Sequence, residues 1–98
     1  MKTIDKMIEH IDEEVEGARE YAEKYIECKS RGHTARASKY KEMAFDELKH
    51  AEYVYGFAEE DVENIRKVYP LSVDEEEKWS HAKRKMHEHI AHIKSYLA

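Results

Sequence analysis

The chain has 98 residues, of which 40% are charged and 41% apolar, and a formal net charge of −5 with neutral histidines. One proline and three glycines favour long helices over a sandwich or barrel, and apolar residues at helical period argue against disorder. The net negative charge gives no basis for binding nucleic acid, and no apolar run approaches the roughly 20 residues of a membrane span, so we expect one all-α domain over residues 1–98 without these partners.

The first predicted helix covers about residues 3–30, and we expect Thr3 to cap its N-terminus. Gly32 in the segment SRGH favours a left-handed end to this helix, and the connection is so short that the next helix must return antiparallel. The apolar residues of the first helix share one face: Ile4, Met7, Ile8, Ile11, Val15, Ala18, Tyr21, Ala22, Tyr25 and Ile26.

The second predicted helix covers about residues 34–68 and ends before Pro70, and the third covers about 73–97 with Ser72 as N-cap. A hairpin with apolar stripes this wide is not covered by one further helix, so we expect self-association into a homodimer or a higher oligomer. The apolar stripe of the second helix consists of Ala37, Tyr40, Ala44, Ala51, Val54, Ala58, Val62 and Ile65. The apolar stripe of the third helix consists of Trp79, Ala82, Met86, Ile90, Ile93 and Leu97.

Two glutamates interrupt these apolar stripes. Glu47 lies in the register of the second stripe and has His50 three residues later, while Glu14 falls between Ile11 and Ala18 of the first. Glu-x-x-His is expected about once by chance in a chain of this composition, so the spacing alone leaves an ion pair or an exposed face as alternatives. A carboxylate buried without a partner would cost several kcal/mol, so we expect a compensating group.

The positions of these residues along the hairpin agree with one another. Glu14 lies about 24 Å before the end of its helix at roughly 1.5 Å per residue, while Glu47 and His50 lie about 20 Å and 24 Å after the start of theirs. In an antiparallel hairpin the three side chains share one level. Side chains at i and i+3 also leave a helix on the same face, so Glu47 and His50 can approach one atom.

This pattern resembles the ferritin-like superfamily, which includes ferritins, rubrerythrins and encapsulated ferritins. The resemblance covers the first two helices: Glu14 is followed seven residues later by Tyr21 in EVEGAREY, and Glu47 begins the segment ELKHA. It implies Glu14 as a terminal metal ligand, Glu47 as a bridging carboxylate and His50 as the nitrogen ligand. It also implies Tyr21 as a nearby hydrogen-bonding phenol.

Ferritins and rubrerythrins have two such helix pairs in one chain, whereas this chain has one. The resemblance is therefore to the half-ferritin arrangement, in which a homodimer completes a ferritin-like four-helix bundle and Glu14, Glu47 and His50 from both chains surround two metal ions. Iron is the expected metal, with manganese or zinc as alternatives. With iron, the resemblance implies a ferroxidase that oxidises Fe(II) with oxygen or peroxide.

Two other functions stay open: metal binding without turnover, and a non-enzymatic helical interaction module in which His50 or a partner's base neutralises the acids. The lone Cys28 and the absence of an apolar leader indicate a reducing, cytoplasmic setting. An encapsulating shell stays an alternative, although the chain ends in IKSYLA with no targeting tail. Gly17 and Gly56 in helix interiors hint at close helix approach or are tolerated defects.

Overall fold

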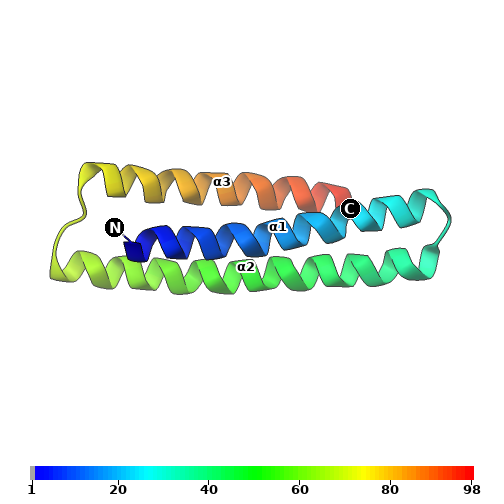
Figure 1. The fold of residues 1–98 in the computed structure, drawn as a ribbon, viewed down its shortest axis with the longest axis horizontal. Coiled ribbons are helices and arrows are strands. Elements are labelled where there is room, and N and C mark those ends of the chain that lie inside the picture. Colours follow the sequence, from blue (N-terminus) through cyan, green and yellow to red (C-terminus); the bar gives the residue numbers. More distant parts are fainter. Residues whose placement is uncertain (1) are drawn as a thin grey trace.

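The computed structural model describes residues 2–98, which form three helices and no strand. Helix α1 covers Lys2–Ser30, α2 covers Thr34–Val68 and α3 covers Val73–Leu97. Helices α1 and α3 run in the same direction and α2 runs antiparallel to them, in a rod of 55 × 19 × 17 Å (Figure 1). The all-α class and the hairpin plus a third helix are confirmed, and the helix limits lie within one residue of those predicted.

The turn between α1 and α2 has the conformation that Gly32 predicts. Gly32 has a φ of 76°, in the left-handed region that favours glycine. Its N–H donates to the carbonyl of Lys29 at 3.1 Å, and the N–H of His33 donates to that of Cys28 at 2.9 Å. These two bonds are those of a Schellman motif, which ends α1 abruptly and returns the chain antiparallel.

The start of α3 is capped as predicted. The Ser72 hydroxyl accepts a hydrogen bond from the Glu75 N–H at 3.1 Å, and the Ser72 N–H donates to the Glu75 carboxylate at 3.1 Å. This reciprocal pair is a capping box. The prediction for Thr3 is wrong, because α1 begins at Lys2 and Thr3 lies inside the helix.

Helix α1 is the central helix, because it packs closely on both α2 and α3 (Figure 1). Long side chains join α2 to α3. Tyr55 of α2 stacks on Trp79 of α3 with ring centroids 6.2 Å apart. The guanidinium of Arg66 on α2 donates two hydrogen bonds to the Glu76 carboxylate on α3, at 2.8 and 2.9 Å. The buried core is Ile4, Ile11, Val15, Ala18, Ala22, Tyr25, Ala37, Ala44, Leu48, Ala51, Ala58, Val62, Trp79, Met86, Ile90, Ile93 and Leu97.

The core differs most from the predicted stripes at two positions, while seven stripe residues are only partly buried: Met7, Ile8, Tyr21, Tyr40, Val54, Ile65 and Ala82. Leu48 is buried although it was not assigned to a stripe, and Ile26 is 41% exposed although it was. The hairpin continues past the C-terminal end of α3, as Figure 1 shows, and Ile26 lies in the last two turns of α1.

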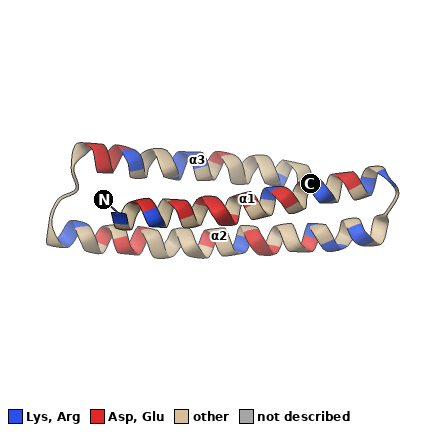
Figure 2. Ribbon diagram, in the orientation of Figure 1, with Lys and Arg blue, Asp and Glu red and all other residues tan. Residues whose placement is uncertain are grey.

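Ion pairs fix α3 along one side of α1. Lys78 pairs with Asp5 at 2.8 Å, and Lys85 pairs with Asp12 at 3.8 Å. Figure 2 shows that acidic residues are frequent in the first half of α1, which lies beside α3. Within residues 2–98, none of the three helices has an apolar stretch long enough to cross a bilayer.

The capping box gives a direct test of how α3 is ordered. Ser72→Ala should lower the free energy of unfolding by about 1 kcal/mol, because the Glu75 N–H at the N-terminus of α3 loses its side-chain acceptor. Urea unfolding followed by circular dichroism measures this. The control is Ser80→Ala in the exposed middle of α3, where alanine should be neutral or slightly stabilising. Equal losses in both variants would contradict a capping role.

Candidate metal site

The structure brings Glu14, Glu47 and His50 together, as the register of the hairpin predicts. His50 Nδ1 lies 3.4 Å from Glu47 Oε1 and 3.8 Å from Glu14 Oε2. One carboxylate oxygen from each glutamate and one imidazole nitrogen all lie within 4.8 Å of one another. Two oxygen donors and one nitrogen donor from two different helices therefore face one small volume.

Gly17 provides the space for this convergence. A Cβ atom at residue 17 would lie 3.0 Å from Glu47 Oε2, so any side chain there would press on the carboxylate. The close helix approach expected at Gly17 stays a prediction, because all the atoms near a Cβ there belong to the Glu47 side chain. The same expectation for Gly56 is wrong, because a Cβ there would meet nothing within 4 Å.

The three side chains are less buried than the apolar register predicts. Glu14 is 23% exposed, Glu47 27% and His50 55%. The reason is the position of α3. Glu14 comes two residues after Asp12, which is paired with α3, and two residues turn an α-helix by about 200°. The site therefore lies on the side of the hairpin that α3 leaves open.

Burial and a like charge perturb the acidity of Glu47. Partial desolvation raises the pKa of the Glu47 carboxyl above its ordinary value, the neighbouring Glu14 carboxyl raises it further, and His50 acts in the opposite direction. Two carboxylates thus lie side by side with one half-exposed imidazole. A bound cation would remove their repulsion.

Tyr21, the predicted hydrogen-bonding phenol, packs against an aromatic ring. Its ring stacks on Tyr40 of α2 with centroids 6.2 Å apart. Within the part of the chain that the structure describes, its hydroxyl makes no hydrogen bond to Glu14, Glu47 or His50. A role for Tyr21 near the metal therefore stays a prediction.

One further histidine lies beside the site. His10 Nε2 is 3.6 Å from Glu14 Oε1, on the opposite edge of the carboxylate from His50. Its position four residues before Glu14 places both side chains on one face of α1. The i, i+4 spacing of His10 and Glu14 is the sequence signal that could have indicated this contact.

The site belongs to a face of the hairpin that we call the ligand face. On each helix its positions alternate by three and four residues, so they share one side. Two of its apolar side chains are solvent-exposed: Met43 is 39% exposed and Phe57 is 64% exposed. The ligand face consists of Met7, His10, Glu14, Gly17 and Tyr21 on α1, and Met43, Glu47, His50, Val54 and Phe57 on α2.

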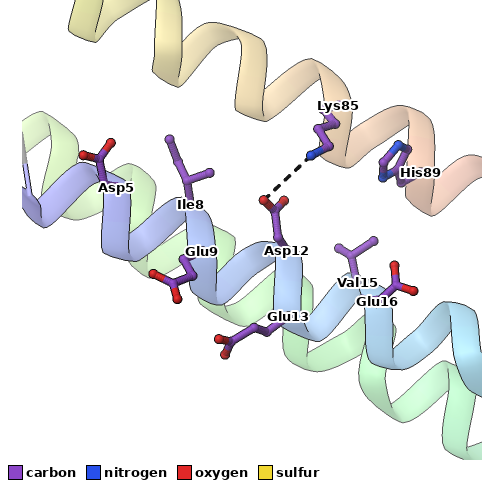
Figure 3. A pocket seen from close by; sticks show the side chains of 9 residues that line it. All are labelled: Asp5, Ile8, Glu9, Asp12, Glu13, Val15, Glu16, Lys85 and His89. Atoms are coloured by element: carbon purple, nitrogen blue, oxygen red, sulfur yellow. Dashed lines mark ion pairs between the residues drawn. The ribbon is translucent and has the colours of Figure 1, made fainter.

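A separate acidic groove of about 480 Å³ lies between α1 and α3 (Figure 3). Asp12 and Glu16 line it from α1, and Lys85 and His89 line it from α3. Its charges are partly paired, since Lys85 points at Asp12 (Figure 3). Elsewhere in residues 2–98, the histidines of α3 included, no other three His, Cys, Asp or Glu side chains gather as closely as those of the candidate site.

Comparison with protein-family models, with curated proteins and with solved structures finds no match to this chain. The resemblance to ferritin-like proteins therefore rests on the pattern of Glu14, Tyr21, Glu47 and His50. What the structure adds is the convergence of three of these four side chains.

The contact at Gly17 can be tested by comparing the two glycines within helices. Gly56→Ala should raise the free energy of unfolding by about 1 kcal/mol, because alanine is the better helix former and the space is open. Gly17→Ala should raise the free energy of unfolding by less, since its methyl group displaces the Glu47 carboxylate. Urea unfolding of both variants measures the difference. Equal stabilisation would show that Glu47 moves aside freely.

The raised pKa of Glu47 predicts a pH-dependent stability in metal-free protein. A carboxyl whose pKa is higher in the folded state than in the unfolded state contributes to the stability of the folded state. This contribution is fully present below the unfolded pKa, near 4.5, and is lost as pH rises through the folded pKa. Glu47→Gln, which does not titrate, should gain stability relative to wild type between acidic and neutral pH. Urea unfolding with a chelator present measures this.

The control for that series is Glu60→Gln, an exposed glutamate on the same helix. A difference between Glu47→Gln and wild type that stays constant across the pH range would contradict the prediction.

Proposed function

We propose that this chain is a helical metal-binding protein in which Glu14, Glu47 and His50 bind a divalent transition-metal ion. In the same proposal, a second copy of the chain brings the same three residues to form a dinuclear site. The observation that carries the proposal is the convergence of two carboxylates and one imidazole within 4.8 Å. The three donors come from two helices whose register is set by a distant turn.

The donor set fits a first-row transition metal. Carboxylate oxygens suit manganese and Fe(II), and an imidazole suits iron and zinc, so all three metals stay candidates and iron is the one that the resemblance favours. The raised pKa of Glu47 reflects carboxylate charge that lacks full compensation. One chain offers three donors here, whereas such ions take four to six ligands. The remaining positions are free for water, substrate or a second copy.

The ligand face supports a second copy as the partner. The exposed Met43 and Phe57 lie on the same side of α2 as Glu47 and His50, so a copy that covers these apolar groups also covers the ligands. A two-fold axis through the face would place the two ligand sets opposite each other. The result would be a ferritin-like bundle of four principal helices with four carboxylates and two imidazoles around two ions.

With iron as the substrate, the proposed reaction is oxidation of Fe(II) by oxygen or peroxide. The two glutamates favour the product, because negatively charged oxygen donors stabilise the more highly charged Fe(III) relative to Fe(II). The imidazole of His50 holds the ion at one side of the site. With zinc or manganese, the same residues would bind metal without turnover.

One observation favours a second candidate, a non-enzymatic helical interaction module. His50 lies within 4.0 Å of both glutamates, so a protonated imidazole can balance one of the charges without a metal. In that case a chelator leaves stability unchanged, and replacement of both acids by glutamine stabilises the fold.

Metal analysis of wild type, Glu47→Ala and His81→Ala distinguishes the two candidates. His81 is an exposed histidine on α3 and serves as the control. Wild type and His81→Ala should bind one Fe(II), Mn(II) or Zn(II) per chain, and Glu47→Ala should lose most of it. Metal at about 100 times its Kd should raise the free energy of unfolding of wild type by about 2.7 kcal/mol.

Absence of binding by wild type to all three ions would refute the metal site. Sedimentation tests the second part of the proposal, since metal-loaded wild type should be a dimer. A metal-loaded monomer would refute the dinuclear site and leave a mononuclear one.

A further inference from the structure

We propose that His10 is a further ligand of the site, so that each chain offers two imidazoles and two carboxylates to its metal ion. The inference rests on the proposed function. Its basis is the position of Glu14, whose carboxylate lies between two histidines. Oε1 is 3.6 Å from His10 Nε2, and Oε2 is 3.8 Å from His50 Nδ1.

These separations are close to those of ligands on one ion. With metal–ligand bonds of about 2.0–2.2 Å, neighbouring donor atoms lie about 3.0–3.4 Å apart in octahedral or tetrahedral geometry. The contacts of Glu14 with His10 and His50, and of His50 with Glu47, exceed this range by at most a few tenths of an ångström. A small contraction around an ion would bring Glu14, Glu47 and His50 to ligand distance, whereas His10 lies outside the group of donor atoms within 4.8 Å of one another and must rotate its side chain toward the ion.

His10 is free to make this movement. Its side chain is 56% exposed, and among residues 2–98 its only polar contact is with Glu14. It lies on the same helix as Glu14, so no backbone shift is needed to bring the two together. Its ring contacts Glu14 and not Glu47, so it would approach the ion from the α1 side, opposite His50.

A second imidazole changes the preference of the site among metals. Sites rich in carboxylate suit manganese, whereas added imidazole favours zinc, nickel and copper. A set of Glu14 and Glu47 with His10 and His50 should therefore discriminate more strongly against Mn(II) than the three-residue set. The alternative is an exposed ion pair of His10 with Glu14, which would contribute little to stability or to binding.

The test compares His10→Gln with wild type and with His81→Gln, a matched exposed histidine on α3. The Kd of each protein for Zn(II) and for Mn(II) is measured by competition with a chromophoric chelator. His10→Gln should weaken zinc binding by about tenfold or more, with a smaller effect on manganese, and His81→Gln should change neither. Pulsed electron paramagnetic resonance of Cu(II)-loaded protein should detect two imidazoles in wild type and one in His10→Gln.

The outcomes separate this inference from the proposed function. If His10→Gln binds zinc as tightly as wild type and both show one imidazole on copper, His10 is not a ligand while the three-residue site stands. If wild type binds none of these ions, both proposals fail. Chelator-treated His10→Gln should unfold at the same urea concentration as wild type. A lower midpoint with an unchanged ratio of zinc to manganese affinity would assign His10 a structural role instead and overturn the inference.

Discussion

The antiparallel register of α1 and α2 is the constraint on which the candidate site depends. The Schellman motif at Gly32 ends α1 sharply, and only residues 31–33 separate the helices. Residues equally far from the turn therefore meet, which brings Glu14 to the level of Glu47 and His50. Because each residue turns a helix by about 100°, one residue inserted between the turn and Glu47 would rotate that carboxylate away from α1.

The docking of α3 determines which side of this hairpin remains open. Asp5 and Asp12 of α1 pair with lysines of α3, and Glu52 of α2 pairs with Lys94 at 3.8 Å. His50 precedes Glu52 by two residues, as Glu14 follows Asp12 by two, so both ligands point away from α3. The same helix that completes the core with Trp79 thus leaves the acids and the exposed Phe57 uncovered.

The sequence predicted the elements well, because their ends depend on local chemistry. Gly32, Pro70 and Ser72 act within a turn of their own positions, and the helix ends at the two turns follow from them. The level of the three ligands was also predictable, since it needs only the helix rise and a short turn. Their exposure was not, because it depends on which face α3 covers, and the apolar contacts and ion pairs between α3 and the hairpin join residues distant in sequence.

Partial exposure gives the site a chemical consequence that a buried site would lack. At about a quarter exposed, Glu14 and Glu47 keep part of their hydration, so the metal-free chain tolerates two adjacent carboxylates at limited cost. A second copy on the ligand face would remove that water and make the repulsion more severe, unless a cation arrived with it. Under the proposed function, metal binding and self-association must therefore be thermodynamically linked, each raising the affinity of the other. Coupling of this kind would keep the metal-free chain from closing its apolar face against another copy.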